Sequence, residues 1–132
     1  MILLDTHCLF WWVNDDQGKL SADALAAIAA ERPDGEILIS SITAWEVAML
    51  VARGRLGLSM DTSAWLATVQ EIEEVKFVPI DNEIAVQAVT LPAEFHKDPA
   101  DRVIIATARK FAVPIVTADE RIRGYPHVRT IW

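Results

Sequence analysis

The sequence predicts an α/β protein with a mostly parallel sheet covered by helices on both faces. Short aliphatic runs, typical of buried strands, alternate along the chain with longer segments that have the capping residues and composition of helices. The chain has 132 residues, which is the size of one domain and is long enough to bury a sizeable core. We therefore expect a single three-layer α/β/α domain over residues 1–132.

The predicted strands are short and almost wholly apolar. A parallel sheet produces such runs because helices cover both of its faces. Asp5 ends the first run, which follows directly from the amino terminus. The predicted strands span residues 2–5, 37–39, 77–80 and 114–117, and residues 128–131 are expected to form an edge strand.

Five of the six predicted helices begin at a residue that can accept a hydrogen bond from the free N–H groups of the first turn. Ser21, Ser40 or Ser41, Asp61 or Thr62, Asp81 and Asp98 are the expected caps, and Pro99 occupies the favoured first position of the last helix. A turn is expected at residues 33–35. The predicted helices span residues 6–13, 21–32, 41–54, 61–74 and 81–91, with a further helix that begins at residue 98.

Composition and charge exclude several classes of protein. The apolar fraction of 52% excludes a disordered tail, and the net charge of −7 is opposite to that of a generic duplex DNA binder. A single cysteine, Cys8, permits no internal disulfide. The sequence has no basic amino-terminal region of a signal peptide and no apolar run long enough for a membrane span. We expect a soluble cytoplasmic protein without a membrane partner.

Four acidic residues follow the predicted strands or begin the adjoining helices: Asp5, Glu46, Asp101 and Asp119. They are far apart in the chain, at separations of 41 (46−5), 55 (101−46) and 18 (119−101) residues. Sites in parallel α/β sheets form at the carboxyl ends of the strands. We therefore expect these carboxylates to meet at one edge of the sheet.

Each acid also has a simpler structural interpretation. Asp98 is most simply an N-cap, Asp101 an acid favoured in the first helical turn, and Asp119 a turn or cap residue. Glu46 and Asp5 are harder to explain in this way because apolar residues surround them, and a buried carboxylate needs a partner.

Carboxylates that converge on one site repel one another, and a divalent cation removes that conflict. A set of oxygen donors without a cysteine or histidine pattern favours Mg²⁺, with Mn²⁺ as a substitute, over Zn²⁺. The natural chemistry of such a site is attack of water on a phosphodiester, with one or two metal ions.

The motifs around these acids resemble those of PIN-domain toxins of the VapC type. The resemblance runs in order through the whole chain. It rests on the segment from Met1 to His7 followed by Trp11 and Trp12, the segment from Ser40 to Val47, the segment from His96 to Ala106, and the segment from Val116 to Arg121. It implies a PIN-like fold and a Mg²⁺-dependent endoribonuclease that is the toxin of a type II toxin–antitoxin pair.

The resemblance also implies roles for individual residues. Asp5, Glu46 and Asp101 would bind the metal, Asp119 would be a fourth acid, and Thr117 would orient a carboxylate or a water. Thr6 would support the site through its hydroxyl or backbone. The implied partners are RNA, a second copy of the chain and a cognate VapB-type antitoxin that places a basic residue near the acids.

Other residues allow two interpretations. Arg121, Arg123 and Arg129 either contact RNA phosphates or belong to an ordinary charged surface, and Arg102 is expected in a surface salt bridge. Three tryptophans are interpreted as core or dimer packing in preference to base stacking: Trp11, Trp12 and Trp45.

Two other functions remain open from the sequence. One is a non-catalytic PIN-like module that binds RNA or a protein, which the complete set of acids disfavours. The other is a phosphatase or phosphoacceptor domain, although an aspartate-nucleophile phosphatase would have a second aspartate two residues after Asp5, where His7 stands. The sequence does not specify the RNA, its cleavage motif, the number of metal ions or the antitoxin.

Overall fold

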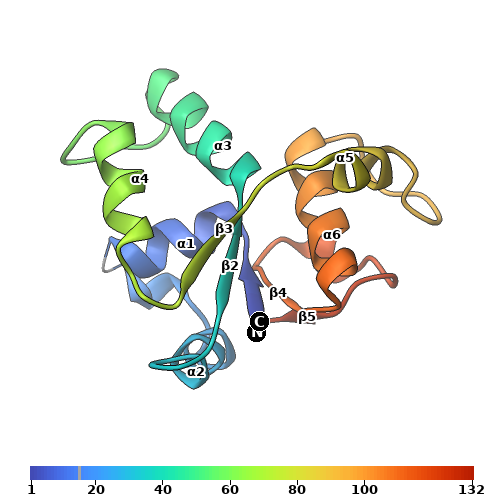
Figure 1. The fold of residues 1–132 in the computed structure, drawn as a ribbon, viewed down its shortest axis with the longest axis horizontal. Helices are drawn as coiled ribbons and strands as arrows, with labels where there is room; N and C mark the ends of the chain where they lie inside the picture. The colour runs from blue at the N-terminus through green and yellow to red at the C-terminus, as the bar shows by residue number, and fades with distance from the viewer. Residues whose placement is uncertain (15) are drawn as a thin grey trace.

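A five-stranded parallel sheet forms the centre of the molecule (Figure 1). The computed structural model describes residues 1–14 and 16–132. Every strand pair is parallel, and the strand order is β3-β2-β1-β4-β5. The strands are β1 (Ile2–Leu4), β2 (Ile37–Ser40), β3 (Val75–Val78), β4 (Ile115–Val116) and β5 (Thr130–Ile131).

Helices occupy the connections between the strands, as the alternating sequence pattern predicts. The caps expected at Ser21, Ser40, Asp61, Asp81 and Asp98 each accept a hydrogen bond from the first turn of their helix. The helices are α1 (Thr6–Val13), α2 (Ala22–Ala30), α3 (Ser41–Ala52), α4 (Thr62–Gln70), α5 (Asn82–Val89), α6 (Pro99–Phe111) and α7 (Glu120–Arg123), with a 3₁₀ turn η1 (Gln17–Lys19).

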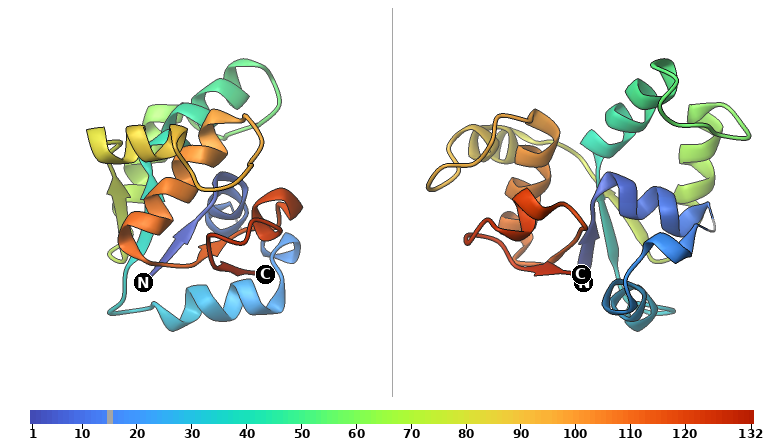
Figure 2. Two further views of the ribbon diagram at one scale, coloured as in Figure 1. Left: turned by 90° about the vertical axis from the view of Figure 1, so that its right-hand side faces the viewer. Right: turned by 180° about the vertical axis from the view of Figure 1, so that it is seen from behind.

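The two faces of the sheet bury two separate apolar cores. Successive side chains of a strand point to opposite faces, so Ile2 and Leu4 enter one core while Leu3 enters the other. Residues of α1 to α4 complete the first core, and residues of α5, α6 and α7 complete the second. Figures 1 and 2 show the resulting helix–sheet–helix layers, with α5 and α6 on the side opposite α1 and α4. The expected α/β/α architecture is confirmed, and the observed strand pairs are all parallel.

The predicted boundaries differ most around the third strand. The helix expected over residues 61–74 ends at Gln70, and the strand expected at residues 77–80 begins at Val75. Pairing with the second strand decides this shift, because Val75 lies opposite Ile37 and is buried, whereas Ile80 is 39% exposed. The short helix α7 and the turn η1 are absent from the sequence prediction, and the expected edge strand is reduced to two residues.

The strand order places β1 between β2 and β4. The carboxyl ends of these three strands, at Asp5, Ser40 and Thr117, therefore lie beside one another. Within the part of the chain that the structure describes, no helix is long and apolar enough to cross a membrane.

Candidate active site

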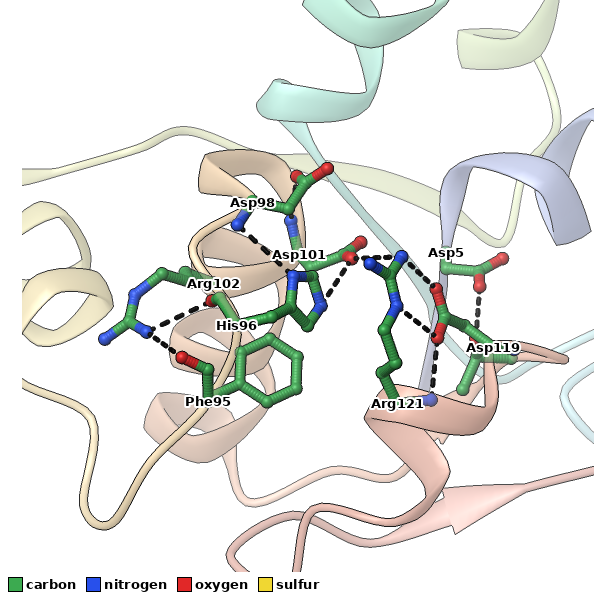
Figure 3. Close-up of polar contacts among 9 residues, drawn as sticks. Asp5, Phe95, His96, Asp98, Asp101, Arg102, Asp119 and Arg121 are labelled. Carbon is green, nitrogen blue, oxygen red and sulfur yellow. Dashed lines mark hydrogen bonds and ion pairs between the residues drawn. The ribbon is translucent and has the colours of Figure 1, made fainter.

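A pocket of about 460 Å³ opens at the carboxyl edge of the sheet, and five carboxylates line it. Figure 3 shows how acids from the end of β1, the start of α6 and the start of α7 face the same space. All four acids singled out in the sequence border this pocket, together with the acid interpreted as a cap. The five are Asp5, Glu46, Asp98, Asp101 and Asp119.

Asp5 is fixed on both of its carboxylate oxygens. It ends β1 and caps α1, where Oδ1 accepts the Cys8 N–H at 2.9 Å, while Oδ2 accepts a hydrogen bond from the Thr117 hydroxyl. Burial raises the pKa of Asp5, and the hydrogen bonds from Thr117 and Cys8 oppose that rise. The carboxylate is thus costly to ionise in the free protein but held in one orientation.

Thr117 lies beneath the pocket and joins two of its acids. Its side chain is fully buried at the end of β4. Its hydroxyl donates to Asp5 and its Oγ1 accepts the Asp119 N–H at 3.0 Å. Thr117 therefore fixes the relative position of the first strand and the loop that leads into α7.

Glu46 enters the pocket from the second turn of α3 and has a threonine partner of its own. The Thr6 hydroxyl donates to Glu46 Oε1, and Thr6 Oγ1 lies 3.0 Å from the hydroxyl of Thr43. Burial raises the pKa of Glu46, the hydrogen bond from Thr6 lowers it, and the negative charge of Asp98 adds to the rise. Thr6 thus links α1 to α3 at the pocket wall.

Asp98 and Asp101 both lie at the start of α6. Asp98 is the N-cap expected from the sequence, since its Oδ1 accepts the Asp101 N–H at 3.2 Å. Burial, followed by the charges of Asp98, Asp119 and Glu46, raises the pKa of Asp101 to about 7. The negative charges of these three carboxylates therefore disfavour the ionised form of Asp101.

His96 is a pocket-edge residue that the sequence does not reveal. Its Nδ1 accepts the Asp98 N–H at 3.2 Å, and its Nε2 lies 3.0 Å from Asp101 Oδ2. Burial and the nearby Arg121 lower the pKa of His96, which favours the neutral ring. Because Nδ1 acts as an acceptor, the neutral ring carries its proton on Nε2, on the side of Asp101.

Arg121 is the second residue whose position the sequence does not predict. Its Nη2 lies 3.1 Å from Asp119 Oδ2 and 3.6 Å from Asp101 Oδ2, and its Nε is 3.4 Å from Asp119 Oδ1 (Figure 3). Burial acts to raise the pKa of Asp119, but the hydrogen bonds and charge of Arg121 outweigh burial, and that pKa is lowered. The basic cluster expected near the carboxyl terminus is therefore divided, since Arg129 instead donates to the carbonyl of Ala112.

One further expectation from the sequence is wrong, and another is wrong in part. Arg102 forms no surface salt bridge within the described residues, and its guanidinium instead donates to the backbone carbonyls of α5 and the following loop. Trp45 is 55% exposed on α3, which excludes the core packing allowed for it but leaves dimer packing as a prediction. Trp11 does line the pocket, where its ring packs between His7 and Trp132 at centroid distances of 5.8 and 6.3 Å.

The donors of the pocket suit a hard divalent cation, although they are not drawn together around one point. Among residues 1–14 and 16–132, no three carboxylate, imidazole or thiol groups are grouped closely enough to form a ready-made metal site. The donor chemistry nevertheless fits Mg²⁺ or Mn²⁺, because the lining offers several carboxylate oxygens in an open space. Three of these carboxylates also have raised pKa values, which a bound cation would lower: Asp5, Glu46 and Asp101.

The parallel sheet with an acid-lined pocket at its carboxyl edge corresponds to a known class of protein. The family model described as "PIN domain" matches residues 2–128, so this is a PIN-domain protein. The chain is also 39% identical, over 99% of its length and 98% of its relative, to Ribonuclease VapC22 of Mycobacterium tuberculosis. The chain belongs to the VapC family of PIN-domain proteins.

Solved structures show the same fold at low sequence identity. VapBC2 from Rickettsia felis, bound to a DNA fragment from its promoter, matches with a TM-score of 0.71 at 15% identity, over 98% of this chain and 97% of that one. Mycobacterium tuberculosis VapC20, a sarcin–ricin-loop-cleaving toxin, matches with a TM-score of 0.62 at 19% identity, over 98% and 99% of the two chains. These likenesses support the fold assignment.

Proposed function

We propose that this protein is a divalent-metal-dependent endoribonuclease and the toxin of a type II toxin–antitoxin pair. The observation that carries the proposal is the convergence of Asp5, Glu46, Asp101 and Asp119 on one open pocket. The 39% identity to a protein named as a ribonuclease supports RNA as the substrate. Hydrolysis of an RNA phosphodiester is the chemistry that such a pocket performs when it holds a metal.

Mg²⁺ is the proposed cofactor, with Mn²⁺ as a substitute, and its ligands would come from Asp5, Glu46, Asp101 and Asp119. When bound, the ion supplies stabilisation of the negative charge that develops at the phosphodiester and lowers the pKa of water. The protein supplies the orientation, since Thr117 fixes Asp5 and Thr6 fixes Glu46. The His96 ring lies against Asp101, with Nε2 3.0 Å from Oδ2, and so limits the space open to that carboxylate.

The proposed partners follow from the family. A VapB-type antitoxin would bind the toxin, in keeping with a fold shared with VapBC complexes. We also propose that residues 1–132 act as one PIN-like domain, that the protein forms a homodimer, and that it works in the cytoplasm.

The direct test replaces one carboxylate at a time without changing its shape. Asp5→Asn and Glu46→Gln should fold but lose RNA cleavage by about a hundredfold or more, the scale found when one electrostatic group is removed from an active site. Cleavage of total RNA is measured with Mg²⁺, with Mn²⁺ and with EDTA. Asp34→Asn and Glu71→Gln make the same chemical changes at exposed positions outside the pocket and should retain full activity.

Two outcomes would contradict this assignment. Folded Asp5→Asn or Glu46→Gln protein with full activity would show that the pocket is not the catalytic site. Tight RNA binding by the wild type without product under any metal would instead favour the non-catalytic binding module. Sequencing of the cleaved RNA ends after brief expression of the wild type and of Asp5→Asn would identify the target and its cleavage motif.

A further inference from the structure

Arg121 places a positive charge in the acid-lined pocket. Its Nη2 contacts Asp119 Oδ2 at 3.1 Å and Asp101 Oδ2 at 3.6 Å, so one nitrogen joins two of the proposed metal ligands. The contacts come from different elements, because Asp101 lies on α6 while Asp119 caps the short helix that carries Arg121. The guanidinium thus holds the two acids in the way that a cation would.

The side chain of Arg121 is held at its tip and is otherwise free. It is 60% exposed, whereas the Asp101 side chain that it contacts is 14% exposed. Water and salt screen the charge of an arginine that is this exposed, which limits the stability that its ion pairs contribute. Arg121 can therefore leave the acids at low cost, while the acids themselves stay anchored in the fold.

We infer that Arg121 is an exchangeable counter-ion that occupies the metal ligands until a divalent cation displaces it. The oxygens of Asp101 and Asp119 that face the guanidinium are those that a cation between these acids would need. A guanidinium that stayed in place would also repel the arriving cation at short range. The inference rests on the proposed function, which supplies the metal.

The structure also provides a place for the displaced side chain. Arg121 lines a second, smaller hollow of about 230 Å³ beside the acid pocket, together with Phe95, His96 and Tyr125. If the RNA strand enters the acid pocket over this rim, as the proposal requires, the guanidinium would meet its phosphate backbone. Arginine is well suited to bind a phosphate in such a position. Metal binding would thus convert Arg121 from a partner of the acids into a ligand of the RNA.

The test measures metal binding without any cleavage. Mn²⁺ affinity is determined by calorimetry at fixed ionic strength for the wild type, for Arg121→Ala and for Arg123→Ala. Arg123 is an exposed arginine on the same short helix, so its loss makes the same change in net charge. Arg121→Ala should bind Mn²⁺ roughly threefold to tenfold more tightly than the wild type, since it removes a competing cation. Arg123→Ala should stay within about twofold of the wild type on the same argument.

A second measurement follows the released side chain. The binding of a short RNA with non-cleavable linkages is compared in Mn²⁺ and in EDTA. Arg121→Ala should weaken RNA binding in Mn²⁺, where the wild-type guanidinium is free, and should leave it unchanged in EDTA, where the guanidinium is paired with the acids. An equal loss of RNA affinity in both conditions would contradict the exchange.

The failure of this inference can be distinguished from failure of the proposed function. Equal Mn²⁺ affinity in all three proteins would overturn the exchange and leave the metal-dependent nuclease intact. No Mn²⁺ binding by any of them, with the fold verified by circular dichroism, would overturn both.

Discussion

At the scale of single residues, Thr117 connects two of the acids that line the pocket. It is fully buried, yet its hydroxyl contacts a carboxylate from the first strand and a backbone N–H from the loop after the fourth. A buried carboxylate that loses a hydrogen-bond donor keeps its full desolvation cost. The position of Asp5 and the stability of the protein should therefore depend on this one hydroxyl.

Replacing Thr117 by valine tests that dependence, because valine keeps the shape and removes the hydroxyl. Thr117→Val should lower the free energy of unfolding by about 1–3 kcal/mol, since the Asp5 carboxylate and the Asp119 N–H lose a partner. It should also raise the pKa of Asp5 further and weaken Mn²⁺ binding. Urea unfolding and calorimetry measure both effects. Thr117→Ser, which keeps the hydroxyl, should lose less than half as much stability, and an equal loss in both variants would contradict the argument.

At the level of residues, the acids of the pocket could be predicted from the sequence, but the two basic residues that contact them, His96 and Arg121, could not. Asp5 stands directly after an apolar strand and Asp119 follows another after two residues, and topology alone brings such positions to one edge. The contacts of His96 and Arg121 depend on the direction of each side chain across the pocket, which no local pattern specifies. The nearest signals were the basic residues near the carboxyl terminus and the proximity of His96 to Asp98 in the chain.

Among the elements, the side chain of Arg102 joins α6 to α5 and to the loop between them. Arg102 donates from Nε to the carbonyl of Ala88 at 2.7 Å and from Nη2 to that of Val89 at 3.1 Å, both at the end of α5. Its Nη1 donates to the carbonyls of Phe95 and His96 at 3.1 and 3.3 Å (Figure 3). The loop that carries His96 to the pocket is therefore tied to both helices.

Replacing Arg102 by lysine would keep the positive charge but remove the planar guanidinium, whose several N–H groups reach these carbonyls. Arg102→Lys should lower the free energy of unfolding by about 1–3 kcal/mol, because several carbonyls lose a donor. It should also increase hydrogen exchange in residues 90–98. Arg109→Lys on the same helix, where the arginine makes one hydrogen bond to the His127 carbonyl, is the matched control. An equal loss of stability in Arg109→Lys would show that the several hydrogen bonds of the Arg102 guanidinium are not what stabilises this connection.

The starts of the helices were more predictable than the third strand for a physical reason. A cap such as Ser21 or Asp81 acts within its own first turn, so its signal lies in a few consecutive residues. The bounds of β3 depend instead on its register with β2, in which Val75 pairs with Ile37. Because this pairing joins residues far apart in the chain, the local run of apolar residues misplaces the strand.

For the whole molecule, the crowded carboxylates make stability depend on pH. The pKa values of Asp5, Glu46 and Asp101 are raised in the folded state, so the folded protein holds protons that the unfolded chain has already released. Stability must then fall as the pH rises from the ordinary carboxyl pKa of about 4 towards the folded value, because the folded state binds more protons over that range. For Asp101 this decline should level off above about pH 7.

The decline is measured by urea unfolding in EDTA between pH 4.5 and 8, with the wild type compared to Asp101→Asn. The variant cannot ionise at this position, so the wild type should lose stability relative to it as the pH rises, and the difference should become constant above about pH 7. Added Mg²⁺ should restore wild-type stability most strongly at the high end, where the carboxylates are ionised. A difference between the two proteins that does not change with pH would contradict the raised pKa of Asp101.

The alternating strands and helices predicted the parallel sheet, but the strand order was not readable from any one segment. That order puts the first strand of the chain in the middle of the sheet, between strands made early and late. During translation β1 can pair with β2 once residue 40 has been made, but it must wait for Ile115 and Val116 to gain its other neighbour. Asp5 likewise lacks its threonine partner until Thr117 has been added. A ribosome making this protein therefore carries an incomplete acid-lined pocket until residue 117 has been added, which delays the appearance of a nuclease next to its own template.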